Sequence, residues 1–344
     1  MDSCGFILGP EVPAFEAEFA RACEVEHAIG VDSGTSALVL ILRGLDIGPG
    51  DEVILQPNTF IATAESISLV GAKPVFADVD LETQQIDPAR VAAAITPRTR
   101  AVVAVHLFGR TAPLEALQRL ARERGIHLIE DACQAHGARF ARRPVGSVGI
   151  AAAWSFYPGK NLGAFGDAGA VTTRDAVLAT AIRQLRDHGQ IAKYDHVRIG
   201  TNARLDSLQA AVLRVKLPHL ESWNAGRRRV AALYDAALRG SEFRLPAPLA
   251  AEEDHVYHLY VVRHPRRSAV VHALRDHGIG FGLHYPVPIH QSAAYAFLGL
   301  GPGSYPNAEL LAEEILSLPM YPELTEAHIE QVCEVMTQAA SLSG

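Results

Sequence analysis

Lys160 is the residue of this sequence best placed for covalent chemistry. It lies in the segment SFYPGKNLG, directly after the apolar run Ala151–Phe156 and between Gly159 and Gly163. A loop at the end of a strand can direct such an amine into a cleft, and a lysine amine forms Schiff bases with carbonyl groups. For an arbitrary loop lysine, exposure to solvent is the more common explanation, so Lys160 needs a chemical partner.

Asp131 offers that partner from the end of another predicted strand. It follows the apolar run His127–Glu130 in the segment IEDACQAHG, and α/β sheets bind ligands at the carboxyl ends of their strands. Burying a carboxylate there is costly unless a cation compensates it. The protonated ring nitrogen of pyridoxal 5′-phosphate (PLP) is such a cation, and the protonated ring is an electron sink for a carbanion. Asp131 alone also fits a helix N-cap, but together with Lys160 it predicts a PLP site.

Hydroxyl and backbone N–H groups suited to a phosphate come from a third segment. Gly34, Thr35 and Ser36 open an apolar helical run, and the first N–H groups of a helix attract anions. Taken alone, this segment is a good helix cap. Ser155 offers another hydroxyl near Lys160.

Phe60 is a candidate for stacking on a flat ring. It follows the predicted strand Asp51–Leu55 within the segment PNTF, where an aromatic ring on a loop can cover a planar ligand. A core phenylalanine is the simpler alternative.

These residues lie in a pattern of alternating strands and helices, which predicts a mostly parallel sheet covered on both faces. The sequence predicts strands at 51–55, 74–77, 101–106, 127–130, 151–156, 169–173 and 255–262, and helices at 62–69, 88–95, 113–124, 205–230 with an interruption at Pro218, 270–276, 308–316 and 326–339. Residues 1–225 would form a large domain, and residues 226–344 a small α+β domain.

Composition narrows the function classes. With 344 residues and a net charge of −7, the chain is long enough for two cores and lacks the basic surface of a non-specific nucleic-acid binder. The four cysteines and 15 histidines show no metal-ligand spacing, and we expect no metal. We also expect no membrane span, no signal peptide and a reducing cytoplasm. Arg110 and Arg227–Arg229 are interpreted as solvated charges.

The motifs GTSAL (34–38), PNTF (57–60), EDACQAHGA (130–138), SFYPGKNLG (155–163), GDAGAV (166–171) and NARLDSLQAAVL (202–213) occur in the order seen in one family. Together they resemble the DegT/StrS family of nucleotide-sugar aminotransferases, from about Gly9 to the C-terminus. The resemblance implies the type I PLP-dependent transferase fold, a large α/β domain with a mainly parallel sheet and a small C-terminal domain.

The resemblance also implies roles for individual residues. Lys160 would carry PLP as a Schiff base, and Asp131 would pair with the pyridine nitrogen. The remaining implied contacts are Gln134 to the ring oxygen, Phe60 on the ring face, Gly34, Thr35, Ser36 and Ser155 to the phosphate, and His284 and Tyr285 near the sugar. Asn202 would reach the phosphate of a neighbouring subunit, so the resemblance implies a homodimer with shared active sites.

The implied reaction is transfer of an amino group, from L-glutamate by resemblance, to a ketone on a nucleotide-linked deoxysugar. The motif combination favours C-3 of a dTDP-3-keto-6-deoxyhexose, with C-4 amination as the close alternative. Amination of a cyclitol or an aromatic precursor is a more distant alternative. A catalytically silent PLP-binding protein is the alternative from another class, and it would predict a damaged Lys160 or Asp131; both are intact.

Overall fold

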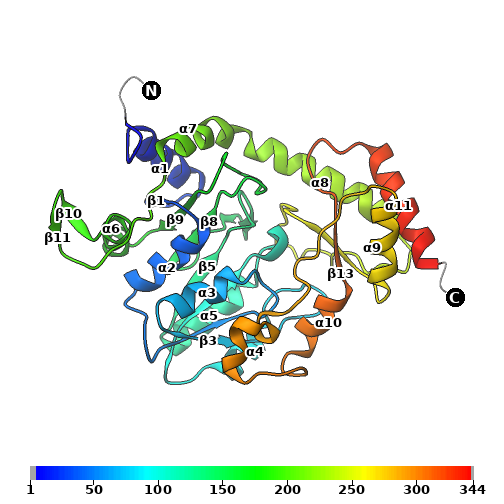
Figure 1. The fold of residues 1–344 in the computed structure, drawn as a ribbon, viewed down its shortest axis with the longest axis horizontal. Coiled ribbons are helices and arrows are strands. Elements are labelled where there is room, and N and C mark those ends of the chain that lie inside the picture. The colour runs from blue at the N-terminus through cyan, green and yellow to red at the C-terminus, as the bar shows by residue number, and fades with distance from the viewer. Residues whose placement is uncertain (1–4, 342–344) are drawn as a thin grey trace.

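A seven-stranded sheet forms the centre of the computed structural model, which describes residues 5–341. The strand order is β1-β9-β8-β5-β4-β2-β3 (Figure 1). Strand β9 runs antiparallel to both of its neighbours, whereas the pairings among β8, β5, β4, β2 and β3 are all parallel. The bounds are β1 His27–Val31, β2 Glu52–Leu55, β3 Lys73–Phe76, β4 Thr99–Val105, β5 His127–Asp131, β8 Ala151–Ser155 and β9 Gly169–Thr173. The expected mainly parallel sheet of the type I fold is confirmed.

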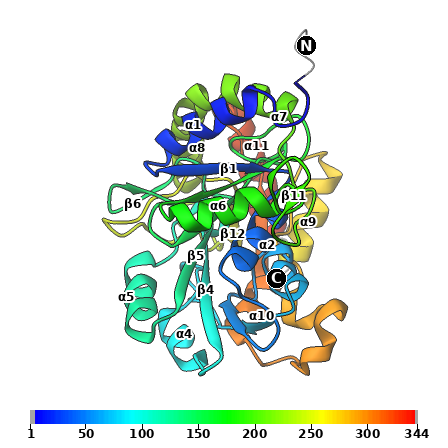
Figure 2. The ribbon, with the colours of Figure 1, turned by 90° about the vertical axis from the view of Figure 1, so that its left-hand side faces the viewer.

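Helices cover both faces of this sheet because its interior strands are apolar on both sides. In β4, Val103 and Val105 pack with helices α2, α3 and α6, whereas Val102 and Ala104 pack with α4 and α5. Helices α1 and α7 cover the face of α4 and α5, beside β8 and β9. Figure 2 shows the layers from the side. The bounds are α1 Glu11–Ala22, α2 Gly34–Gly44, α3 Ala62–Leu69, α4 Pro88–Ala94, α5 Leu114–Arg124, α6 Ala176–Leu185 and α7 Ser207–Lys216.

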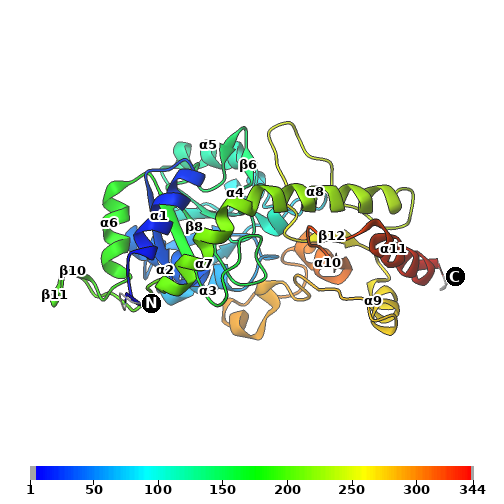
Figure 3. The same ribbon diagram turned by 90° about the horizontal axis from the view of Figure 1, so that it is seen from above.

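The C-terminal third lies beside the sheet and is joined to it by the long helix α8, Leu220–Ala237 (Figure 3). Pro218 interrupts the helical stretch as predicted, within the 3₁₀ turn Leu217–His219. A separate apolar cluster is built from side chains between Val230 and Ala340. The remaining elements are β12 Tyr260–Arg263, α9 Arg267–Asp276, α10 Pro306–Glu314, β13 Ile315–Leu318 and α11 Glu326–Ser341. The division at residues 225 and 226 stays a prediction, and α8 runs across it.

Two short ribbons and three 3₁₀ turns lie outside these layers. Two-stranded ribbons are formed by β6 (Arg139–Phe140) with β7 (Arg143–Pro144), and by β10 (Gln190–Ala192) with β11 (Asp195–His196). The β10–β11 hairpin projects from one end of the molecule (Figures 1 and 3). The 3₁₀ turns are Leu107–Gly109, Ile289–Gln291 and Ala293–Leu298. Among residues 5–341, no helix combines the length and hydrophobicity that a membrane crossing requires.

Two predicted elements in the C-terminal third are wrong in their bounds. The strand expected over 255–262 forms only at β12, because the Tyr257 N–H donates to the His255 ring and Tyr257 adopts a positive φ of 43°. The helix expected over 308–316 ends at Glu314, and the chain then extends as β13, which pairs antiparallel with β12. Helix α1 and strand β1 were not predicted.

Of the arginines interpreted as solvated charges, Arg110 and Arg227 are buried, so the prediction is wrong for these two; Arg228 is half-buried and Arg229 is exposed. Arg110 is only 4% exposed, donates to the carbonyls of Ala247 and Pro248, and pairs with Glu253. Arg227 is buried in the same way, where it donates to three backbone carbonyls. A guanidinium has five donors, so carbonyl groups from several loops can satisfy it without solvent.

Candidate active site

A cavity of about 370 Å³ opens at the carboxyl ends of β5 and β8. It is the crevice where open α/β sheets bind ligands. Nine of the predicted site residues line it: Gly34, Thr35, Phe60, Asp131, Gln134, Ser155, Lys160, His284 and Tyr285. The structure therefore brings together residues that lie up to 251 positions apart, counted from Gly34 to Tyr285 (285 − 34).

Lys160 lies in the turn that follows β8, and its backbone N–H donates to the Tyr157 carbonyl. The next residue, Asn161, is buried and donates to Asn224 in α8 and to the Val256 carbonyl. Burial lowers the pKa of the Lys160 ammonium, while the negative charges of Cys133 and Asp131, where ionised, act to raise it. Burial thus increases the fraction of the amine that is neutral and nucleophilic.

Asp131 ends β5 and is only 6% exposed. Its Oδ2 accepts a hydrogen bond of 2.8 Å from the Thr63 hydroxyl, and its Oδ1 accepts one of 3.2 Å from the Cys133 N–H. Within residues 5–341 no arginine, lysine or histidine forms an ion pair with this carboxylate. Because a buried charge without a cation is costly, the geometry fits a cationic ligand atom in the cavity.

Gln134 is oriented by two hydrogen bonds. Its Oε1 accepts from the Phe108 N–H at 2.7 Å, and its Nε2 donates to the Tyr285 hydroxyl at 3.2 Å. Phe108 adopts φ 63° and ψ 3°, a left-handed conformation that is uncommon for a residue with a side chain. The amide group of Gln134 is therefore fixed with its donor end toward Tyr285 and the cavity.

The start of α2 lies directly against β8. Ser33 caps the helix, since its Oγ accepts from the Ser36 N–H at 3.1 Å. A Cβ atom on Gly34 would lie 2.8 Å from Ser155 Cβ and from Cys133 Sγ. Only glycine allows this close approach, which places the Ser155 hydroxyl beside the open N–H groups of the helix.

Three predicted site residues occupy less central places. Phe60 is 52% exposed at the mouth of the cavity, where its ring lies 5.5 Å from the Tyr285 ring. Ser36 is absent from the cavity wall; it contacts Ser33 and lines a second, outer groove. Asn202 is exposed and lies outside the cavity of its own chain. Its predicted contact is with another subunit, so its role stays a prediction.

The sequence reasoning missed several residues of this site. Tyr157 and Asp167 line the cavity and belong to the motifs SFYPGKNLG and GDAGAV, so these two motifs carried the signal for them. Cys133 also lines the cavity, and it belongs to the same motif as Asp131, EDACQAHGA. Thr63 and Asn224 gave no local signal, because they reach the site only through the tertiary fold.

These features fit PLP. The cavity combines a desolvated amine, a buried carboxylate with no cationic partner among the described residues, a fixed amide donor and a helix N-terminus with adjacent hydroxyls. Those groups match the aldehyde, the ring nitrogen, the ring oxygen and the phosphate of that cofactor.

Comparison with known proteins agrees with this geometry. A dTDP-3-amino-3,4,6-trideoxy-alpha-D-glucose transaminase of Streptomyces venezuelae is 49% identical over 99% of this chain and 90% of its own length. A UDP-N-acetyl-3-dehydro-alpha-D-glucosamine 3-aminotransferase of Acidithiobacillus ferrooxidans is 46% identical over 98% and 90%. The crystal structure of S. venezuelae DesV with a ketimine intermediate superposes with a TM-score of 0.97 at 48% identity, covering 100% of this chain and 92% of that one.

The family match extends over residues 1–337. Solved relatives include forms with PLP and with its pyridoxamine counterpart, and PLP is the cofactor of this enzyme. From its sequence, its fold and its cavity, the chain belongs to the DegT/DnrJ/EryC1/StrS aminotransferase family.

Proposed function

We propose that this aminotransferase moves an amino group from L-glutamate to C-3 of a dTDP-linked 3-keto-6-deoxyhexose. The observation that supports this most is that Lys160 and Asp131 line one cavity, while no residue in the described part of the chain forms an ion pair with the buried carboxylate. The choice of C-3 is supported by relatives named as 3-amino-sugar transaminases, one of them 49% identical. The donor follows from the family resemblance alone.

The cofactor supplies an electron sink that stabilises negative charge at the reacting carbon. Lys160 would act as nucleophile and as the base that takes the proton from the donor Cα, because burial favours its neutral amine. Asp131 would hold a positive ring nitrogen in place, with Thr63 keeping its carboxylate oriented. Gln134 would donate from Nε2 to a ring oxygen, since its Oε1 is already occupied by Phe108.

Two half-reactions can be tested separately. The purified protein should be yellow, and glutamate should bleach it as the amino group is transferred. The bleached form should then regain its colour with dTDP-linked 3-keto sugars and not with 4-keto sugars. Recovery only with 4-keto sugars would move the assignment to C-4, and a yellow protein indifferent to every amino donor would favour a silent PLP-binding protein.

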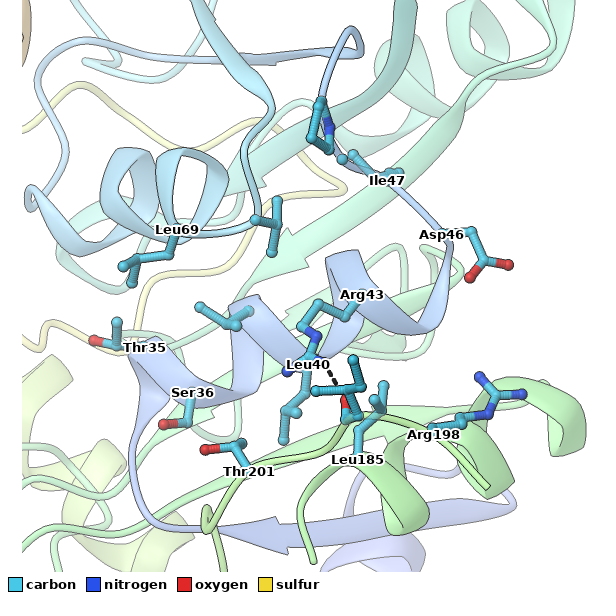
Figure 4. Close-up of a pocket in the computed structure, with 15 residues that line it drawn as sticks. Thr35, Ser36, Leu40, Arg43, Asp46, Ile47, Leu69, Leu185, Arg198 and Thr201 are labelled. Atoms are coloured by element: carbon cyan, nitrogen blue, oxygen red, sulfur yellow. Dashed lines mark hydrogen bonds between the residues drawn. The ribbon is translucent and has the colours of Figure 1, made fainter. Parts of the chain in front are cut away.

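We further propose a homodimer in which each subunit completes the other's site. An outer groove of about 940 Å³ lies between α2 and the segment 198–201. Figure 4 shows Arg43, Leu69 and Arg198 around it, and the Arg43 guanidinium donates to the Ile199 carbonyl. Leu69 is 70% exposed and Ile199 is 87% exposed, an apolar surface that a second copy of the chain would cover.

The segment from the β10–β11 hairpin to Asn202 lines this groove at residues 198–201 and carries Asn202, the residue predicted to contact the partner's phosphate. Tyr194 and Val197 at the hairpin are exposed by 81% and 52%. In a dimer built on this surface, Asn202 would face the Thr35 region of the partner.

Mixed dimers test this arrangement. Lys160→Ala and Asn202→Ala variants should each be impaired, and unfolding and refolding them together should restore activity to about a quarter of native when every hybrid dimer keeps one intact site. A mixture no more active than the better single variant would contradict shared sites.

A further inference from the structure

His284 forms the wall between two cavities. It lines the active cavity together with Lys160, and it also lines a second cavity of about 540 Å³ in the C-terminal third. Ser317, in strand β13, lines only the second cavity. A side chain there can act on the reaction only through a neighbour, and that neighbour is the His284 imidazole.

Two features outside the active cavity hold the imidazole. Its Nδ1 lies 2.8 Å from the Ser317 hydroxyl, and the Ser317 backbone is itself fixed by two hydrogen bonds with Gly282, of 2.8 and 3.0 Å. Gly282 also provides the space for the ring: a Cβ at this position would lie 2.4 Å from His284 Cε1. Position 282 therefore sets where the ring lies, and Ser317 sets its rotation.

The second ring nitrogen is left for a ligand. Among the described residues, Nε2 of His284 has no hydrogen-bond partner, whereas Nδ1 is engaged. Burial lowers the pKa of His284, and the Lys160 charge lowers it further. A neutral ring with one nitrogen engaged directs its other nitrogen to one place.

We propose that Ser317 is a positioning residue that, with Gly282, directs His284 Nε2 at the keto-sugar substrate. The inference rests on the proposed function, because it requires the sugar to occupy the cavity beside His284. In this proposal His284 acts on the sugar half-reaction alone, whereas Lys160, Asp131 and Gln134, on the cofactor side of the cavity, act on both half-reactions.

Ser317→Ala and Ser317→Thr make a matched pair, since threonine keeps the hydroxyl on a strand that accepts β-branched residues. In Ser317→Ala, recolouring of the bleached enzyme by the keto sugar should need about 5- to 10-fold more sugar, the effect of losing one neutral hydrogen bond. Bleaching by glutamate should stay within about 2-fold of native, and Ser317→Thr should behave as native in both half-reactions. Gly282→Ala, which displaces the ring but keeps Ser317, should reproduce the sugar defect.

Crystal structures of the two Ser317 variants provide a readout independent of turnover. The imidazole should rotate in Ser317→Ala and keep its orientation in Ser317→Thr. Equal losses in both half-reactions, or a native sugar dependence in Ser317→Ala with the ring unmoved, would overturn the proposal. If the native bleached enzyme recovers colour with no nucleotide-linked keto sugar, the proposed function fails instead, and the crystal structures still report on the ring.

Discussion

The active cavity and the outer groove meet at the start of α2 but differ in how their groups are satisfied. In the active cavity, polar groups are fixed within one chain: Asp131 by Thr63, Gln134 by Phe108, and His284 by Ser317. The outer groove, of about 940 Å³, instead exposes apolar side chains such as Leu69 and Ile199.

The two regions therefore differ in what they are suited to bind. The cavity is preorganised for a small ligand, because its side chains already have their orienting partners. The groove leaves apolar side chains in water, and exposed apolar surface of this kind is typical of interaction sites. We therefore expect substitutions in the cavity to change chemistry while leaving assembly intact. Substitutions in the groove should weaken assembly first and, because the proposed dimer shares its active sites, lower activity as a consequence.

The largest effect should come from Lys160→Ala. Loss of both nucleophile and proton carrier should lower turnover by at least about 10⁴-fold, measured as amino-sugar formation. Lys73→Ala, an exposed lysine on β3, is the control and should retain native activity. Both proteins should form the native oligomer, and substantial transamination by Lys160→Ala would show that the nucleophile lies elsewhere.

Asp131→Asn should lower kcat/KM by about 100-fold or more, because an amide cannot neutralise a positive ring nitrogen. Thr63→Val keeps the side-chain shape but removes one hydrogen bond to Asp131, and it should cost only about 5-fold. Steady-state kinetics with glutamate distinguish the two. Equal rates for Asp131→Asn and native enzyme would remove Asp131 from the mechanism.

In the groove, Ile199→Glu should weaken self-association by at least about 30-fold, since it buries an unpaired carboxylate. Val177→Glu is the control: Val177 is 78% exposed on α6 and does not line the groove. Analytical ultracentrifugation over a dilution series measures the dissociation constant. An unchanged constant for Ile199→Glu would show that this groove is not an interface between copies.

The smallest effect concerns acid stability near the active cavity. Burial, reinforced by the charge of Lys160, lowers the pKa of His136 to about 3, whereas an unfolded histidine titrates near 6.5. As the pH falls below about 6.5, the unfolded state gains a proton that the folded state resists, so this residue destabilises the fold progressively toward pH 3. His136→Phe should reduce the slope of unfolding free energy against pH near pH 5 by about 1.4 kcal/mol per pH unit.

Urea denaturation of the native protein and His136→Phe at several pH values close to pH 5 measures that slope. His328→Phe is the matched control, because His328 is exposed on α11 and should leave the slope unchanged. Identical slopes for native and His136→Phe would mean that His136 titrates normally in the folded state.

The alternation of apolar strands and helices predicted the sheet well, because buried parallel strands must be apolar along their whole length. It missed β1, which the neighbouring β9 stabilises by antiparallel pairing. It also missed β13, which continues from a helical pattern and becomes extended only by pairing with β12. Arg110 and Arg227 were misjudged for the same reason, since the carbonyls that receive them come from distant loops.

The sequence by itself determined the reactive groups of this protein: the amine of Lys160 and the carboxylate of Asp131, each at the end of a strand that its own pattern predicts, and the polar start of α2. Only the tertiary structure decided what orients them, namely Thr63, Phe108 and Ser317. Reactive groups come from local motifs, whereas a hydrogen-bond partner is chosen by the packing of segments that lie far apart along the chain.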